Sequence, residues 1–352
     1  MSHLGIVLYH GIDSGAELRG YGQLAEDAGF ESLWVTERYF HEETFSMLGF
    51  LAAVTQRIKL GVGVVNPYTR NPALLAMASA TLDRLSGGRF LLGLGRSEQP
   101  VIQDKMGIPY GNSRTALVET VSHLRRLFAG ERVTTQEGRS KLDNVKLATT
   151  PLQPKLPIYL AGIGTKGLRL VGEIADGVIL NAYVPPAYVR YAVAEIRSAA
   201  TAAGRDPNAI DMACMLVIRL TDDPDSMRPT LKQRIVRLLD EHRVGEILLE
   251  EVRGHPVGVN GGNRGHAHGA DLGHRTETHE LDLGGIAPRS PDFRCEERRH
   301  VAADHESRLL ADGDIHRVGG GHIRDREVGL AAIPRIGGGL VSASQMVPVD
   351  VG

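Results

Sequence analysis

The chain has 352 residues, of which 42% are hydrophobic, and a formal net charge of −2. This length allows one large β/α barrel or two ordinary domains. The nearly neutral charge gives no reason to expect nucleic acid or an anionic membrane surface as the main partner. With only Cys214 and Cys295 a disulfide scaffold is excluded, and no signal-type N-terminus or membrane-length apolar run is recognisable, so a reducing, cytoplasmic setting is predicted.

The composition changes near residue 250. Residues 251–352 contain no lysine, one aromatic residue, 18 glycines, 12 arginines and nine of the 14 histidines. A single globular domain seldom changes so sharply at one point. We therefore predict a folded domain over residues 1–250 and an atypical Gly/Arg/His-rich segment over residues 251–352.

Short apolar strands alternate with helical stretches in the first part, which is typical of β-α units on a parallel sheet. The predicted strands are Leu4–Tyr9, Ser32–Thr36, Ile58–Val65, Arg89–Leu94, Pro157–Ala161, Gly177–Asn181 and Ile210–Leu220. The predicted helices are Ala16–Ala28, Phe45–Thr55, Ala73–Leu85, Arg114–Phe128, Thr165–Ile174, Pro186–Ala203 and Arg228–Asp240, with a hairpin over Val133–Val145. Asn71-Pro72 supplies an N-cap and a first-turn proline to the third helix, which ends at Gly87-Gly88.

Seven strands fit either a β/α barrel or a doubly wound open sheet. A doubly wound sheet usually carries a glycine-rich dinucleotide turn after its first strand, and residues 10–13 have no such fingerprint. We therefore predict an α/β fold, a (β/α)8 TIM barrel. The usual eighth strand and closing helices are not recognisable after residue 250, where Gly339–Val351 is the one strand-like run near the end.

In a β/α barrel the active site lies at the carboxyl ends of the strands. That rule selects His10, Gly11, Glu37, Arg38, Tyr39, His41, Val65, Asn66, Gly95, Arg96, Ser97, Gly162, Gly164, Thr165, Asn181 and Tyr183. Among them Glu37, Arg38 and His10 are the predicted catalytic residues, since imidazole titrates near neutrality and charged groups are dense after the second strand. The alternatives are an internal ion pair that holds the loop and a structural histidine.

The turn Ala161–Gly167 is the best candidate anion site, because small residues let backbone N–H groups approach a phosphate at a helix N-terminus. Arg96 can reach the same anion with two hydrogen bonds. The alternatives are glycines needed by the turn itself and a surface arginine. Gly61 and Gly63 lie inside a central strand, which indicates either a flat ring against the backbone or a bend or bulge.

Three blocks carry a resemblance to a known family: Asn66–Pro72, Ala80–Arg89 and Leu92–Gly95, with Trp34–Glu37 and Ala175–Val178 fitting the same pattern. They resemble the luciferase-like monooxygenase superfamily. Within it, the chain is most similar to the branch of methylenetetrahydromethanopterin reductases and related enzymes that use the deazaflavin coenzyme F420. The resemblance runs from about residue 4 to residue 250.

The resemblance implies a flavin or deazaflavin ring at the mouth of the barrel and a non-prolyl cis peptide at Gly63-Val64. It also implies phosphate contacts from Arg96 and the turn after the fifth strand. The predicted cofactor-binding set is Gly63, Val64, Asn66, Gly95, Arg96, Gly162, Ile163, Gly164, Thr165 and Asn181, and no metal site is predicted.

Two departures from the family limit what is transferred. The light-emitting branch carries a histidine where Arg38 stands, so its oxygen chemistry is not carried over. The methanopterin reductases carry a glutamate in the first strand where this chain has Val7, so their substrate does not follow either, and Glu37 is the substitute polar group. We predict an F420-dependent oxidoreductase that transfers a hydride to or from a small organic substrate, with a homodimer left open. The alternatives are an FMN-dependent monooxygenase and a non-catalytic, truncated remnant.

Residues 251–352 have three interpretations. A histidine-rich tract can bind a metal, here through His266, His268, His274 and His279. A polar segment with little apolar periodicity can also stay without a core. We favour the third, an altered reading frame in a GC-rich gene, which accounts for the Gly/Arg/His excess and for the absence of lysine.

Overall fold

The computed structural model describes residues 4–218, 223, 225–226, 228–233 and 330–332. The predictions made for residues 251–352 therefore lie outside the described residues, apart from the short segment 330–332. The same holds for the predicted strand Gly339–Val351 and for the end of the predicted helix Arg228–Asp240, of which residues 228–233 are helical.

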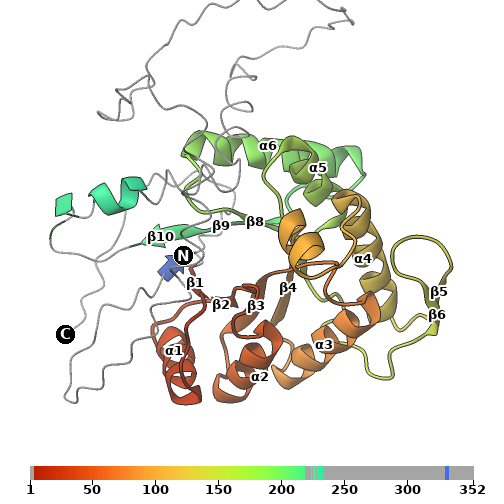
Figure 1. Ribbon diagram of the computed structural model, residues 1–352, viewed down its shortest axis with the longest axis horizontal. Coiled ribbons are helices and arrows are strands. Elements are labelled where there is room, and N and C mark those ends of the chain that lie inside the picture. Colours follow the sequence, from red (N-terminus) through yellow and green to blue (C-terminus); the bar gives the residue numbers. More distant parts are fainter. Residues whose placement is uncertain (1–3, 219–222, 224, 227, 234–329, 333–352) are drawn as a thin grey trace, which may run out of the picture. The chain divides into compact units, whose positions relative to one another are not determined.

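Seven parallel strands form one sheet whose spatial order follows the chain order (Figure 1). They are β1 (Gly5–Leu8), β2 (Ser32–Val35), β3 (Lys59–Val65), β4 (Phe90–Leu94), β7 (Ile158–Ala161), β8 (Gly177–Leu180) and β9 (Asp211–Cys214). The intervening helices are α1 (Gly15–Asp27), α2 (Thr44–Val54), α3 (Pro72–Leu85), α4 (Ser113–Phe128), α5 (Thr165–Ile174) and α6 (Pro186–Ala202). A doubly wound sheet reverses its strand order near the middle, and this one does not. The barrel-type prediction is confirmed, with seven of its parallel strands within the described residues.

Two local features differ from the prediction. The predicted strand Ile210–Leu220 divides at Met215 into β9 and β10 (Leu216–Ile218), and β10 pairs antiparallel with β11 (Leu330–Ala332). A π-helical turn, η1 (Pro100–Lys105), follows β4. The hairpin of β5 (Val133–Thr135) and β6 (Leu142–Val145) lies where it was predicted, as do the caps of α3 at Asn71 and Gly87-Gly88.

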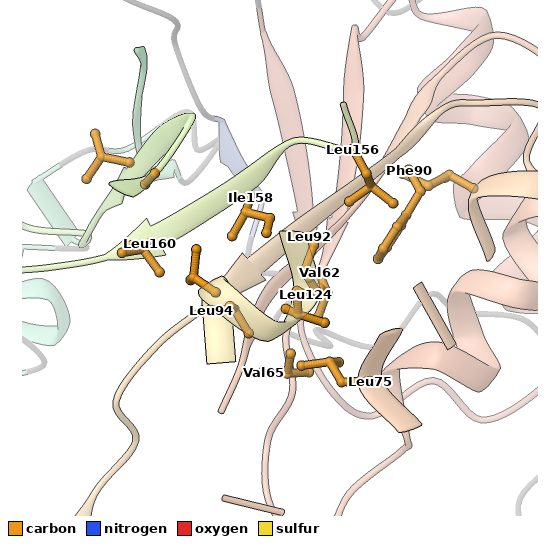
Figure 2. Close-up of a cluster of buried hydrophobic side chains, with 14 of the residues drawn as sticks. Val62, Val65, Leu75, Phe90, Leu92, Leu94, Leu124, Leu156, Ile158 and Leu160 are labelled. Carbon is orange, nitrogen blue, oxygen red and sulfur yellow. The ribbon is translucent and has the colours of Figure 1, made fainter. Parts of the chain in front are cut away.

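Alternate residues of the strands face the helices and form the main core. Figure 2 shows this layer where β3, β4 and β7 meet α3 and α4, with fully buried side chains at Val62, Phe90, Leu92, Leu94, Ile158, Leu160, Leu75 and Leu124. Each such side chain contributes about 1.5–3 kcal/mol by leaving water. The period of two along each strand fixes which residues point the other way.

The opposite face of the sheet carries a smaller core that includes two aromatic rings. Trp34 of β2 and Tyr159 of β7 meet edge to face with their centroids 5.3 Å apart. A Cβ atom at Gly61 would lie 2.3 Å from Trp34, and one at Gly177 would lie 2.3 Å from Tyr159. Gly61 of β3 and Gly177 of β8 therefore make room for aromatic rings of the neighbouring strands. None of the helices in the described part of the chain is long and apolar enough to cross a membrane.

Candidate active site at the carboxyl ends of the strands

The turns after the parallel strands bring the predicted site residues to one edge of the sheet, because the carboxyl ends of parallel strands share that edge. In strand order they are His10 after β1, Glu37 and Arg38 after β2, Gly63, Val64 and Asn66 in and after β3, Gly95 and Arg96 after β4, Gly162, Ile163, Gly164 and Thr165 after β7, and Asn181 after β8.

Strand β3 bulges at the mouth. The Gly63-Val64 peptide bond is cis, as the resemblance implied, and the register with β4 shifts between Val62 and Val65. The neighbouring strand accommodates this bulge through its glycines. A Cβ atom at Gly93 would lie 2.1 Å from the Val62 carbonyl oxygen, and one at Gly95 would lie 2.6 Å from Val64 Cγ2.

These contacts give Gly95 a packing reason to be glycine, separate from its predicted role beside a cofactor. They also show that β3 and β4 are matched in shape at the mouth, since any side chain on the two β4 glycines would meet the bulge. The cofactor-binding role of Gly95 stays a prediction.

Glu37 forms a bidentate ion pair with Arg70. Its two oxygens accept hydrogen bonds of 2.7 and 2.6 Å from Arg70, and Glu43 accepts a third of 2.5 Å. Burial disfavours a charged Arg70, but the pairs with Glu37 and Glu43 outweigh burial and raise its pKa. The guanidinium also lies 5.2 Å from the Phe45 ring centroid. The loop after β2 is thus held by the internal ion pair that was the alternative for Glu37.

Tyr39, Asn66 and Ser97 link the turns after three neighbouring strands. The Tyr39 hydroxyl accepts a 3.0 Å hydrogen bond from the Asn66 side-chain amide and shares a hydrogen bond with the Ser97 hydroxyl. Burial raises the pKa of Tyr39, with Glu37 adding to the effect, so the phenol stays protonated at neutral pH. The Asn66 carbonyl oxygen accepts N–H groups of Tyr68 and Thr69, which leaves it little capacity for a ligand.

The turn after β4 is held from its other side by Tyr110. The Tyr110 hydroxyl lies 3.0 and 3.1 Å from the carbonyl oxygens of Arg96 and Ser97. Ser97 adopts a left-handed backbone with φ of 58°, an uncommon conformation for a residue with a side chain. The Arg96 side chain is exposed, and no hydrogen bond or ion pair joins it to another described residue.

The turn from β7 into α5 joins backbone to helix closely. Gly164 is the N-cap of α5 and provides no side-chain cap for the first-turn N–H groups. A Cβ atom at Gly162 would lie 3.1 Å from the Gly167 carbonyl carbon, which is a packing reason for that glycine. The Thr165 hydroxyl pairs with Tyr191 at 2.7 Å, and the Ile163 carbonyl accepts the Tyr188 hydroxyl.

The rings of His10 and His41 contact each other in a tilted arrangement after β1 and β2. Their ring centroids are 4.3 Å apart at an angle of 43°. Burial lowers the pKa of His10, and the positive charge of Arg38 and the neighbouring His41 lower it further against the opposing effect of Glu42. Glu42 Oε1 accepts N–H groups of Gly11 and Ile12 at 3.0 and 3.1 Å, which ties the first turn to the second.

A shallow hollow of about 250 Å³ lies over this loop, lined by Glu37–Glu43, Thr69, Arg70 and Met106. Asn181, on the far side of the mouth, accepts the Ala182 N–H through its own side chain, and Tyr183 beside it has a left-handed backbone. Within the part of the chain that the structure describes, no three His, Cys, Asp or Glu residues are grouped to hold a metal.

The residues that sequence reasoning missed are Arg70 as the partner of Glu37, and Tyr110 as a support of the fourth turn. Arg70 was visible as a charged residue directly after the Asn66 turn, but its pairing with Glu37 depends on which strands are neighbours. Tyr110 had no local signal.

The model of the family described as luciferase-like monooxygenase matches residues 2–291. A 5,10-methylenetetrahydromethanopterin reductase from Methanolobus tindarius is 40% identical over 58% of this chain and 61% of its own length. One from Archaeoglobus fulgidus is 36% identical over 60% of this chain and 63% of its own length. The chain therefore spans about three fifths of the length of these curated relatives.

Solved structures agree on the fold. The coenzyme F420-dependent tetrahydromethanopterin reductase from Methanopyrus kandleri has a TM-score of 0.59 at 27% identity, covering 70% of this chain and 82% of its own. The monooxygenase RslO1 from Streptomyces bottropensis has a TM-score of 0.56 at 28% identity, covering 71% of this chain and 79% of its own.

Proposed function

This chain belongs to the luciferase-like monooxygenase family, and from that membership we propose that it is an oxidoreductase that uses coenzyme F420. In the proposed reaction, a hydride moves between the reduced deazaflavin and a small organic substrate. The similarity to the coenzyme F420-dependent tetrahydromethanopterin reductase supports the coenzyme. A cytoplasmic setting stays a prediction from cysteine content.

The observation that carries the proposal is the donor set beside the bulge of β3. The Arg96 guanidinium has no partner among the described residues, and the first turn of α5 has no side-chain cap at Gly164. A free guanidinium and uncapped N–H groups at a helix N-terminus are the donors that a phosphate prefers. These residues fit the phosphate of the coenzyme, with Gly162, Ile163 and Thr165 completing the turn.

The chain's own residues would bind, orient and exclude water. Deazaflavin supplies the hydride chemistry when it is bound, and the protein supplies position. We propose that His10 and Arg38 contact the substrate. Glu37, whose two oxygens are both held by Arg70, is proposed as a positioning residue that fixes the loop carrying Arg38.

An FMN-dependent monooxygenase is the second candidate. The similarity to the monooxygenase RslO1 favours it, since that structure matches this chain about as well as the reductase does. Position 38 is an arginine, whereas the light-emitting branch carries a histidine there. This difference favours the deazaflavin coenzyme.

Absorbance and fluorescence titrations of the full chain with F420 and with FMN test the proposal. We expect F420 to bind and FMN not to bind. Arg96→Gln should weaken F420 binding at least tenfold, because one bidentate phosphate contact is lost. Arg84→Gln, at the exposed end of α3, is the matched control and should bind like wild type. Binding of FMN alone would establish the second candidate, and binding of neither would leave the non-catalytic remnant.

A further inference from the structure

The three carboxylates of the loop after β2 are engaged away from Arg38. Glu37 and Glu43 both accept hydrogen bonds from Arg70. Glu42 Oε1 instead accepts the N–H groups of the first turn. No acidic side chain of this loop is therefore within ion-pair distance of Arg38 in the described structure.

Arg38 itself is exposed at the mouth. No hydrogen bond or ion pair joins its side chain to the residues that the structure covers. This contrasts with Arg70 of the same hollow, which pairs with two carboxylates. A guanidinium carries five N–H donors in a fixed fork that matches a carboxylate, so Arg38 presents unused donors to a ligand.

Two histidines stand beside Arg38. The backbone N–H of His41 donates to the backbone carbonyl oxygen of Arg38 at 3.2 Å, and the centroids of the His41 and His10 rings are 4.3 Å apart. Arg38 and His41 both line the hollow of about 250 Å³. Burial is the main cause of the lowered pKa of His10, and Arg38 and His41 lower it further, so the His10 ring lies close enough to both to feel their charge.

The strand order places these donors on one flank of the bulge in β3. Strands β1 and β2 lie on one side of β3, and β4 and β7 lie on the other. Arg96 and the uncapped turn of α5 belong to the β4–β7 flank, which is proposed to take the coenzyme phosphate. Arg38, His10 and His41 belong to the β1–β2 flank, where the hollow of about 250 Å³ lies over the loop after β2.

We propose that Arg38, together with His10 and His41, binds a carboxylate of the acceptor substrate, so that the substrate class is a small organic acid. The inference rests on the proposed function, because it assigns the β1–β2 flank to the second reactant. A planar guanidinium with two imidazole groups gives a carboxylate directional hydrogen bonds as well as charge, and so fixes which end of the substrate faces the β3 bulge.

The test uses the full chain with ¹³C-labelled histidine and follows the ring C–H signals by NMR, without coenzyme. Benzoate and benzamide are the probes, because they share a shape and differ in charge. His10→Gln and His41→Gln assign the two signals. We expect benzoate to shift both signals and benzamide to shift neither.

Variants then attribute the effect to Arg38. Arg38→Gln should weaken benzoate binding at least tenfold, and Arg38→Lys should restore part of it, because an ammonium keeps the charge but lacks the fork. Arg57→Gln removes an exposed arginine at the amino end of β3 and is the matched control. Equal shifts with both probes, no shift with benzoate, or an unchanged affinity in Arg38→Gln would overturn the proposal.

An F420 titration of the same preparation separates the two hypotheses. If benzoate binds in a way that depends on Arg38 but F420 does not bind, the carboxylate site is supported and the proposed coenzyme is contradicted. If F420 binds but benzoate does not, the proposed oxidoreductase is supported and the carboxylate site is contradicted.

Discussion

Glu37 holds Arg70 with both carboxylate oxygens, in a pair whose side chains are 11% and 19% exposed. Such a pair is shielded enough that losing one partner leaves a poorly solvated charge on the other. The pair therefore holds the conformation of the loop after β2, whatever part Glu37 has in the chemistry.

Glu37→Gln should lower the free energy of unfolding by about 1–3 kcal/mol, because Arg70 loses a charged partner in a partly buried place. Urea denaturation measures this. Glu173→Gln, which breaks the exposed pair with Arg114, is the control and should cost less than about 1 kcal/mol. Equal losses of unfolding free energy in the two variants would show that the Glu37–Arg70 pair stabilises the fold no more than an exposed ion pair does.

His123 of α4 predicts a pH dependence of stability. The residue is buried, its Nδ1 has no partner among the described residues, and burial is the main cause of a pKa below its ordinary value of 6.5. The unfolded chain then binds the proton more tightly than the folded one, so the stabilising contribution is present above pH 6.5 and is lost as the pH falls toward the folded pKa.

Urea unfolding of wild type and His123→Gln between about pH 7.5 and 5.5 tests this linkage. We expect the fall in stability toward low pH to be smaller in the variant. Ser122→Ala, at the exposed neighbouring position, should keep the wild-type slope. A wild-type slope in His123→Gln would assign the pH dependence to other groups.

The sequence placed the candidate residues on turns at the carboxyl ends of the strands, but it could not show which contacts they make. Glu37 was predicted as catalytic with an ion pair as the alternative; the ion pair is with Arg70, which lies 33 residues away in the chain, and the catalytic role stays a prediction. Pairings over such distances depend on strand order, which no local pattern of residues contains. The same reason explains why Tyr110 was missed.

At the scale of elements, β3 and β4 pack closely because glycines in β4 leave space for the bulge of β3. The two β4 glycines receive the bulge of β3, and Gly61 receives Trp34 of β2. Glycine normally weakens a strand, so its recurrence on one face indicates close packing at each position.

Gly93→Ala tests this fit. The added Cβ atom would lie 2.1 Å from the Val62 carbonyl oxygen, so either strand must shift. We expect a loss of about 3 kcal/mol, the upper end for an overpacked core, measured by thermal or urea unfolding. Gly20→Ala is the control in α1, where nothing lies within 4 Å, and it should stabilise by about 0.5–1 kcal/mol. A neutral Gly93→Ala would contradict the proposed fit.

The element pattern was predictable where apolar runs and caps were strong. Strands β1 to β8 and the caps of α3 follow from sequence, because buried parallel strands are continuously apolar and Asn-Pro and Gly-Gly mark helix ends. The division of the last predicted strand at Met215 was not predictable. The apolar run continues through it, and only pairing with residues 330–332 separates β10 from β9.

At the scale of the whole molecule, α2 and all but the last turn of α3 present an uncharged outer surface. Residues Thr44–Val54 and Pro72–Leu82 contain no charged side chain, and Leu74, Met77 and Leu85 of α3 are more than half exposed. A surface helix normally carries charges on its outer face, and an exposed apolar stripe marks an interaction site. The homodimer left open by the sequence is expected to use this surface, and it stays a prediction.

Met77→Asp places a charge in the middle of that surface and should shift the chain toward the monomer. Size-exclusion chromatography with light scattering measures the shift. Leu24→Asp, at an equally exposed leucine of α1, should leave the assembly unchanged. A wild-type chain that is monomeric at every concentration would contradict the predicted homodimer.

The boundary near residue 250 also stays a prediction, because it falls outside the described residues. Limited proteolysis with mass spectrometry should leave a core ending near that position. Uniform protection through residue 352 would show that the composition change is not a domain boundary. Sequencing the gene around codon 250 tests the altered reading frame directly.

Trp34 is the only tryptophan of the chain, and it lies 2% exposed against Gly61 on the inner face of the sheet. The protein therefore carries a single indole, and emission excited selectively in that indole reports one place, the interior beneath the β3 bulge. Loss of the barrel packing will shift that emission as water reaches the indole. A chromophore bound at the mouth will quench it by energy transfer, so one optical signal distinguishes an unfolded chain from a folded chain with an empty mouth and from a folded chain with a bound coenzyme.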